Sequence, residues 1–213
     1  MTSARHKWTL EEVVDSVGPG AILRNYVEQR DVRACLLAAA VHGPIRRAAD
    51  VGCGYGRLTP VLSEVASEVW GLEREALFVD EAKRLQPKAQ FLQVESLERL
   101  PLPDNSVDFA MTFTVMQHMR KQNAIAVCIE LKRIAQHGFV LVVEETDPTL
   151  ADDDSDSGGG GVTIGRSVDT YREWMRPFEL VLQRAREIEP GYPRPDVGTY
   201  MLFEAPGRSG GNA

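Results

Sequence analysis

A glycine-rich segment, Asp50–Gly56 (Asp-Val-Gly-Cys-Gly-Tyr-Gly), is the first part of the chain whose residue types and spacing indicate ligand binding. It follows a short apolar run, Arg47–Val51, and precedes residues 58–65, whose aliphatic side chains recur at helical spacing. Glycines suit such a strand-to-helix turn because the chain bends tightly and a ligand must approach the backbone closely. Open parallel sheets bind ligands at this position, outside the carboxyl ends of their strands.

The residues around the glycines narrow the choice of ligand. The dinucleotide fingerprint Gly-x-Gly-x-x-Gly requires a glycine where this chain has Arg57, so the loop matches a pyrophosphate poorly. Glu73 follows Gly52 by 21 residues and ends the next expected strand, where a carboxylate can accept hydrogen bonds from two ribose hydroxyls. Asp50 precedes the loop and could attract a cationic group or accept hydrogen bonds from backbone amides.

Strand-like apolar runs alternate with helical patterns on both sides of this segment. We expect strands at 47–51, 69–73, 91–94, 107–113 and 139–143, and helices at 10–41, 58–65, 75–85 and 124–136. Gly18-Pro19-Gly20 divides the first helical region in two. Alternation of this kind implies right-handed crossovers and a parallel sheet.

The alternation ends after Glu145. Residues 152–161 combine an acidic run with four glycines, a composition that cannot pack a core. A helix is expected at 167–175, and strands at 178–183 and 198–203 are expected to pair as an antiparallel hairpin. The predicted fold is therefore α/β: a Rossmann-like, doubly wound, mostly parallel seven-stranded sheet with a C-terminal antiparallel hairpin.

Three segments resemble motifs of the class I S-adenosylmethionine-dependent methyltransferases, in particular the small-molecule, type 11-like branch. Asp50–Gly56 is similar to the first motif of that family, Leu100–Asp108 to its loop between the third and fourth strands, and Val115–His118 to its segment after the fourth strand. The resemblance covers about residues 48–143, with a looser match as far as Phe203. It implies a methyltransferase with S-adenosyl-L-methionine as its cofactor, and it is specific for the superfamily but not for a substrate.

The resemblance also implies which residues near the glycines contact the cofactor. Asp50, Gly52, Gly54 and the backbone around Cys53 would line its amino-acid half. Glu73 would hold the ribose. Arg74 or Leu72, the residues on either side of Glu73, would flank the adenine.

Two later strand ends complete the expected cofactor site. Where the family usually has an acidic residue that reaches the adenine amino group, this chain has Ser96, followed by Leu97. The serine hydroxyl can still accept a hydrogen bond, and the leucine could pack on the adenine ring. Thr112 or Phe113, at the end of the fourth strand, would face the sulfonium.

Methyl transfer from a sulfonium requires an aligned acceptor and, where the acceptor is a hydroxyl, removal of its proton. His118 is the first candidate base, because an imidazole titrates near neutral pH and this residue follows the fourth strand; a structural role is the alternative. Glu144 and Glu145 end the fifth strand at the same rim and could orient a substrate or act as the base, or could simply be solvated.

Tyr171 and Trp174 lie on the helix expected after the glycine-rich stretch, and the family's topology suggests that this helix forms a wall or lid of the acceptor pocket. The stretch itself could be an entry loop or a spacer. Its acidic run lacks the ligand pattern of a calcium loop, and the three cysteines form no Cys/His cluster, so no metal is expected.

The net charge of −7 repels polyanions and so disfavours nucleic acid or an acidic membrane as the main partner. The chain shows neither a signal-peptide pattern nor an apolar run long enough to span a bilayer, which favours the cytoplasm. We expect a helical cap at 1–44, a cofactor-binding methyltransferase domain at 45–205 with a flexible insert at about 151–161, and a disordered tail at 206–213. The oligomeric state is left open.

The preferred hypothesis is a small-molecule methyltransferase, with oxygen as the expected target atom. Methylation of protein or nucleic acid is an alternative, although residues 112–115 (Thr-Phe-Thr-Val) differ from the Pro-Pro-aromatic turn of the enzymes that methylate nucleic-acid amino groups. A second alternative is a non-catalytic S-adenosylmethionine-binding module or a domain of a larger biosynthetic protein. A nicotinamide dehydrogenase is disfavoured by Arg57.

Overall fold

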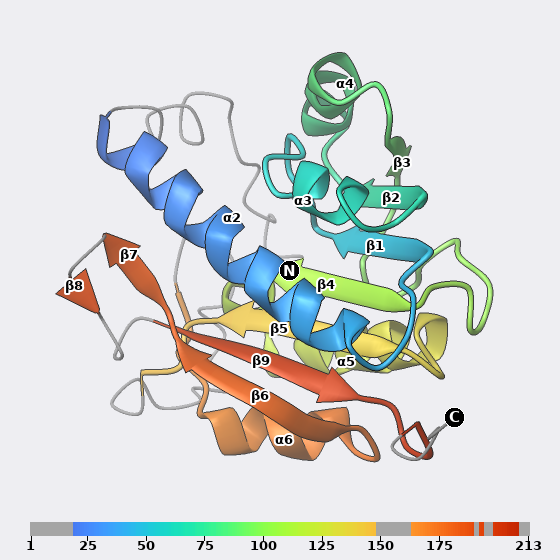
Figure 1. Cartoon of the computed structure of the whole chain (residues 1–213), viewed down its shortest axis with the longest axis vertical. Helices are drawn as coiled ribbons and strands as arrows, with labels where there is room; N and C mark the ends of the chain where they lie inside the picture. The colour runs from blue at the N-terminus through green and yellow to red at the C-terminus, as the bar shows by residue number, and fades with distance from the viewer. Residues whose placement is uncertain (1–18, 148–162, 190–191, 194–197, 209–213) are drawn as a thin grey trace, which may run out of the picture.

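A seven-stranded sheet forms the centre of the molecule (Figure 1). The computed structural model describes residues 19–147, 163–189, 192–193 and 198–208. The strand order is β3-β2-β1-β4-β5-β9-β6. The strands of the sheet are β1 (Arg47–Val51), β2 (Glu68–Glu73), β3 (Gln90–Gln93), β4 (Phe109–Phe113), β5 (Phe139–Glu144), β6 (Glu179–Ala185) and β9 (Thr199–Glu204). The pairs among β1 to β5 are parallel, whereas β9 is antiparallel to β5 and β6, which confirms the predicted fold class.

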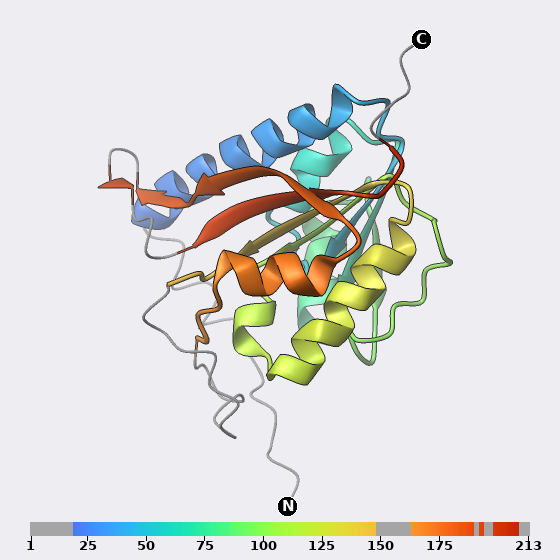
Figure 2. The same cartoon turned by 90° about the horizontal axis from the view of Figure 1, so that it is seen from below.

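Helices cover both faces of this sheet. They are α2 (Pro19–Ala40), α3 (Thr59–Ser63), α4 (Ala76–Leu85), α5 (Lys121–Ile134), α6 (Val168–Met175) and the short 3-10 helix η2 (Met116–His118). Figure 2 shows α2 on one face and α5 with α6 on the other. Successive strand residues point to opposite faces, so Phe109 packs in the core beneath α2 and α3, whereas Ala110 packs in the core beneath α5 and α6.

The strand order reverses beside β1. From β1 the chain proceeds to β2 on one side, and it later returns to the other side of β1 as β4. Such a switch point opens a crevice at the carboxyl ends of the two diverging strands. The residues that follow β1 and β4 are therefore brought together, although some 60 positions separate them in the chain.

The C-terminal strands differ in detail from the expected hairpin. β6 and β9 do pair antiparallel, but β9 inserts between β5 and β6 and leaves β6 at the edge of the sheet. All six residues of β9 are buried, whereas burial alternates along β6, as an edge strand requires. The connection between them is not a simple turn, because β7 (Glu187–Glu189) and β8 (Tyr192–Pro193) form a separate two-stranded ribbon.

Parts of the expected domain organisation lie outside the described residues, namely the helix expected before Gly18, the insert at about 151–161 and the last five residues. The expected tail begins at Pro206, yet the structure continues to Arg208, whose guanidinium donates to the carbonyl of His137 and stacks over the Phe139 ring. No helix within the described ranges is both long and apolar enough to cross a bilayer.

Gly138, at the turn between α5 and β5, is required by close backbone packing. A Cβ atom added there would lie 2.4 Å from the carbonyl oxygen of Asp108, which accepts a hydrogen bond from the Phe139 amide. Gly138→Ala is expected to lower the free energy of unfolding by about 2 kcal/mol, because overpacking against backbone cannot be relieved by a rotamer change. Urea denaturation measures this, with the exposed neighbour Gln136→Ala as control; equal midpoints for both variants would contradict it.

Candidate functional site

The glycine loop after β1 is in contact with the segment after β4. The Gly52 and Cys53 amides both donate to the carbonyl of Leu72, at 2.7 and 3.2 Å. Gly52 has a φ of +75°, and a Cβ atom there would lie 2.5 Å from Cγ2 of Val115. Gly54 also has a positive φ, +54°, but a Cβ atom there would meet nothing within 4 Å. The space beside Gly52 is therefore filled by Val115, whereas the space beside Gly54 is empty.

Glu73 connects the end of β2 to the open part of this loop. Its Oε2 accepts a hydrogen bond from the Gly54 amide at 2.9 Å, and its Oε1 accepts from the amides of Arg74 and Glu75 at 2.7 and 3.0 Å. The Arg74 side chain turns away to pair with the Glu75 carboxylate. The two parts of the expected cofactor site that lie 21 residues apart are thus adjacent in space.

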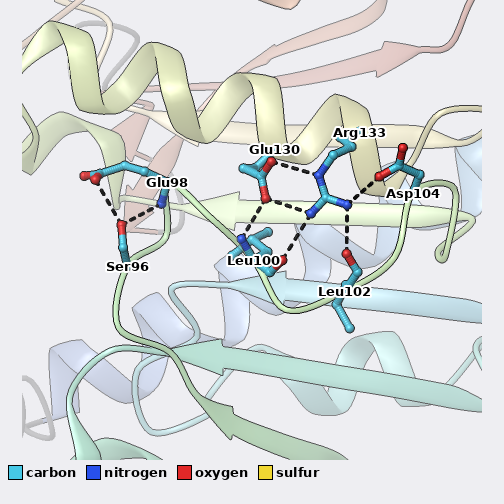
Figure 3. Close-up of polar contacts among 7 residues, drawn as sticks. All are labelled: Ser96, Glu98, Leu100, Leu102, Asp104, Glu130 and Arg133. Atoms are coloured by element: carbon cyan, nitrogen blue, oxygen red, sulfur yellow. Dashed lines mark hydrogen bonds and ion pairs between the residues drawn. The ribbon is translucent and has the colours of Figure 1, made fainter.

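The loop between β3 and β4 is held against α5 (Figure 3). The Arg133 guanidinium donates to the carbonyls of Leu100 and Leu102 and to the carboxylates of Asp104 and Glu130. Glu130 also accepts a hydrogen bond from the Leu100 amide at 2.7 Å. This network fixes the path of the loop that the sequence matched to the family's third-to-fourth-strand segment.

Ser96 and Leu97 begin the same loop. The Ser96 hydroxyl accepts from the Glu98 amide at 3.0 Å and donates to the Glu98 carboxylate at 2.9 Å, as Figure 3 shows. Leu97 is almost completely buried, and its Cδ1 lies 3.4 Å from the position of a Cβ atom on Gly52. Leu97 therefore reaches the glycine loop, while the Ser96 hydroxyl is engaged locally.

Asp50 lies below the loop in an almost completely buried position. Its Oδ2 accepts a hydrogen bond from the Thr59 hydroxyl at 2.7 Å. Burial raises the pKa of Asp50 to about 7; the Thr59 hydrogen bond and the charge of Arg57 act in the opposite direction, and the nearby Glu73 adds to the increase. Ionisation of Asp50 near neutral pH therefore changes the electrostatic potential at the glycine loop.

Thr112 and Phe113 end β4 with side chains on opposite faces of the sheet. Thr112 is fully buried, and among the described residues its hydroxyl has no hydrogen-bond partner. The Phe113 ring lies on the α2 side, where the guanidiniums of Arg57 and Arg186 stand 5.0 and 5.1 Å from its centroid. The two candidates for the sulfonium position therefore offer different surroundings: a buried hydroxyl on one side and an aromatic ring flanked by cations on the other.

Glu144 holds the segment that follows β4. Its carboxylate is fully buried and accepts hydrogen bonds from three successive amides, those of Val115, Met116 and Gln117, at 2.9 to 3.1 Å. Burial raises the pKa of Glu144 to about 7, although the three amides and the charge of Arg166 act to lower it. Because this carboxylate is fully buried and its oxygens serve these amides, the geometry favours a positioning role over direct contact with an acceptor. Glu73 also accepts three amides, but it is only half-buried.

Arg166 is a site residue that the sequence reasoning missed. It is buried, and its guanidinium donates to the carbonyls of Met116 and Met119 at 2.7 and 2.6 Å. Its own amide donates to the carbonyl of Glu145 at 3.2 Å. An arginine between a glycine run and a helix start resembles an ordinary exposed charge. No sequence pattern therefore revealed that Arg166 binds the carbonyls of η2, whose amides Glu144 accepts.

Gln117 and His118 lie on η2 at the same edge of the sheet. The Gln117 side-chain oxygen accepts a hydrogen bond from the Glu145 amide at 2.9 Å. That contact directs the amide nitrogen of Gln117 toward Nε2 of His118, 3.3 Å away. With the Gln117 amide nitrogen as the donor, Nε2 of His118 is the acceptor in this contact.

Tyr171 and Trp174, the residues expected to line an acceptor pocket, differ in burial. Tyr171 is fully buried in the core between α5 and α6, and its ring packs edge-on against Trp174 at a centroid distance of 5.6 Å. Trp174 is partly buried, and the Arg166 guanidinium lies over its ring, 5.5 Å from the ring centroid. Trp174 is therefore partly accessible to solvent, whereas Tyr171 is not. Within the described ranges, no three His, Cys, Asp or Glu side chains converge as a metal site.

Comparison with known proteins agrees with this geometry. Residues 49–143 match the family model described as a methyltransferase domain. An uncharacterised methyltransferase of Schizosaccharomyces pombe is 32% identical over 113 residues, a stretch that spans 47% of this chain and 40% of that protein. The chain therefore matches less than half the length of this curated relative.

Two solved structures have the same fold. A SAM-dependent methyltransferase from Leishmania major has a TM-score of 0.71 at 18% identity, covering 92% of this chain and 76% of that one. Magnesium protoporphyrin IX methyltransferase from Synechocystis, solved with bound SAM, has a TM-score of 0.65 at 14% identity, covering 94% of this chain and 86% of that one.

Glu144→Gln is expected to release the segment after β4. A glutamine places an NH2 group against one of the three amide donors, which leaves a buried donor unsatisfied and costs about 1–3 kcal/mol. The amides of Val115, Met116 and Gln117 should then exchange faster with deuterium, as measured by NMR. Glu179→Gln, at an exposed position on β6, is the control; unchanged exchange at all three amides would refute the positioning role.

Asp50→Asn is expected to change the pH dependence of stability. Since burial raises the pKa of Asp50 from 3.8 to about 7, the stability that Asp50 contributes is fully present below about pH 4 and is lost as the pH rises through 7. An asparagine side chain does not titrate, so the variant should gain about 2 kcal/mol relative to wild type between pH 5 and pH 7, at about 1.36 kcal/mol per pH unit. Urea titrations across this range measure the difference, with exposed Asp80→Asn as control; a constant difference would contradict the pKa assignment.

Proposed function

Because this chain contains a methyltransferase domain of the class I S-adenosylmethionine-dependent superfamily, we propose that it transfers a methyl group to a small-molecule acceptor, at an oxygen atom, in the cytoplasm. The observation that carries the proposal is the contact of Glu73 with the Gly54 amide at the switch point of the sheet. It places a carboxylate beside an open glycine loop, the arrangement that binds a ribose.

The residues at this point fit the cofactor. Open space at Gly54 leaves room beside the backbone for an amino-acid chain, and Gly52 and Cys53 continue the same wall. We assign Glu73 to the ribose, and we assign Leu97 to the adenine ring because its side chain reaches the glycine loop. When bound, S-adenosylmethionine supplies a methyl group already activated on a sulfonium, so the protein mainly has to align the acceptor.

A small molecule is the acceptor class that charge and similarity favour. The net charge of −7 opposes binding of polyanions. Proteins of the same fold include one named magnesium protoporphyrin IX methyltransferase and one named phosphoethanolamine N-methyltransferase, from Haemonchus contortus, with TM-scores of 0.65 and 0.68. Both names specify low-molecular-weight acceptors, and the second also names the methylated atom, nitrogen.

Oxygen as the target requires a group that removes the hydroxyl proton, and we assign this role to His118. The Gln117 amide donates to Nε2 of His118, so this nitrogen presents a lone pair, as a base requires. Glu144 positions the segment that carries this histidine, and Glu145 lies at the same rim. The alternative is a module that binds the cofactor without transferring its methyl group.

Methyl-labelled S-adenosylmethionine distinguishes these possibilities. The wild-type protein, incubated with labelled cofactor and a cell extract, should transfer label to small molecules that pass a dialysis membrane, and the product should carry an O-methyl group by mass spectrometry. Glu73→Ala should weaken S-adenosylhomocysteine binding at least ~10-fold, since it removes charge-assisted hydrogen bonds. His118→Ala should retain that binding but lose transfer.

Each other outcome identifies a specific alternative. Label in protein or RNA would replace the small-molecule proposal with a macromolecular acceptor. Tight S-adenosylhomocysteine binding with no transfer to any fraction would favour the non-catalytic module. Transfer that persists in His118→Ala would remove the histidine as base, and N-methylated product would remove oxygen as the target.

A further inference from the structure

Three arginines surround one buried glutamate between α2, the glycine loop and the end of β6. Glu28, on α2, is fully buried. Its carboxylate pairs with Arg186 at 2.5 Å, with Arg57 directly after the glycine loop, and with Arg24 one helical turn earlier at 3.8 Å. We refer to Arg24, Arg57, Arg186 and Glu28 as the arginine cluster.

The arginine cluster has more positive than negative charge. Among the described residues, three guanidiniums face a single carboxylate, a surplus of two positive charges within a protein whose net charge is −7. The neighbouring ion pairs on α2, β6 and β7 do not offset it, because Arg30 and Arg184 are balanced there by Asp31 and Glu187. The Arg24 and Arg57 side chains are partly exposed, whereas Arg186 is buried. Buried charge is costly unless it is paired, so Arg186 is the member of the cluster best suited to receive an anionic group.

The arginine cluster lies at the same edge of the sheet as the cofactor site. Arg57 and Arg186 flank the Phe113 ring at the end of β4. The Arg186 side chain passes directly over Gly198, where a Cβ atom would lie 3.2 Å from its Cδ and 2.9 Å from the carbonyl oxygen of Glu144. The positive charge is therefore concentrated where β4 and β5 end, beside Phe113, one of the two candidates for the sulfonium position.

Two buried donors at this place have hydrogen-bonding capacity left over. Nε of Arg186 and the Tyr200 hydroxyl are buried and have no hydrogen-bond partner among the described residues. Tyr200 lies near the start of β9, and its ring packs edge-on against Phe113 at a centroid distance of 6.0 Å. Both groups donate, and both adjoin the same aromatic ring, so they suit a ligand that offers acceptor oxygens. Burial and the charges of Glu28 and Asp31 raise the pKa of Tyr200, which keeps its proton in place.

We propose that Arg186 and Tyr200 bind the carboxylate of an anionic acceptor, which makes carboxylate-bearing small molecules the preferred substrate class. This inference rests on the proposed function. A guanidinium matches a carboxylate in charge and geometry, and the phenol can donate to one of its oxygens. Arg57 lies nearer the glycine loop, so the cofactor's own amino-acid carboxylate is the other source of the same chemistry.

Benzoate is a minimal probe for this site, because it combines a carboxylate with a ring that can pack near Phe113. The protein is first saturated with S-adenosylhomocysteine. Benzoate and its uncharged analogue benzamide are then titrated at constant ionic strength, while the arginine Nε–H signals are followed by NMR. The Arg186 signal, assigned through Arg186→Lys, should shift saturably with benzoate and stay unchanged with benzamide.

Variants test the two donors separately. Arg186→Lys should weaken benzoate binding at least ~10-fold, since lysine keeps the charge but cannot reproduce the paired hydrogen bonds of a guanidinium to a carboxylate. Tyr200→Phe keeps the packing and removes only the hydroxyl, so it should weaken binding several-fold. Arg184→Lys is the matched control, because Arg184 is a β6 arginine paired with Asp31 outside the arginine cluster.

Four results would overturn the inference: no saturable shift of the Arg186 signal, an equal shift with benzamide, unchanged binding in Arg186→Lys, or competition by the cofactor's carboxylate. Competition is detected by repeating the titration with 5′-methylthioadenosine, which lacks the amino-acid group. Benzoate binding with this ligand but not with S-adenosylhomocysteine would assign Arg186 to the cofactor. Calorimetry of S-adenosylhomocysteine on the same samples separates the two proposals, because absence of that binding contradicts the proposed function itself.

Discussion

Hydrogen bonding by one buried carboxylate determines how the edge of this sheet is arranged. The amides of residues 115–117 have no strand to pair with once β4 has ended, and Glu144 accepts all three of them. In that position Val115 packs against the backbone of Gly52, which leaves room for no side chain there. The conformation of the glycine loop and the placement of η2 therefore both depend on Glu144, and Arg166 secures the same segment through two of its carbonyls.

Two carboxyl groups with raised pKa values lie on either side of this contact. Asp50 is beneath the glycine loop and Glu144 is beneath η2, and burial raises the pKa of each to about 7. Their surroundings oppose that increase in different ways: Asp50 has one hydroxyl donor, and Glu144 has three amides. The site thus lies between two carboxyl groups whose charge changes with pH near neutrality. The surplus positive charge of the arginine cluster lies on the α2 side of the sheet.

Much of the fold was predictable because local patterns and the parallel sheet constrain each other. The strand ending at Val51 and the strand ending at Glu73 were expected within one residue of their observed ends, since glycines and charged residues mark where each strand stops. The place of β9 was not predictable. Its six residues read as an apolar strand, but nothing in their order indicates insertion between β5 and β6 rather than addition at the edge.

By itself, the sequence determined the α/β alternation, the glycine loop and the adjacency of that loop to Glu73, because backbone conformation and strand order follow from local residue types and from the handedness of crossovers. Only the tertiary structure decided which charged residues are buried and with which partners. Arg166, Arg186 and Glu28 read as ordinary surface charges along the chain, and Tyr171 reads as a possible pocket residue, yet all four are buried. Burial of a charge depends on contacts between segments far apart in the chain, such as α2 with the residue that follows β6, and those contacts leave no periodic pattern in the sequence.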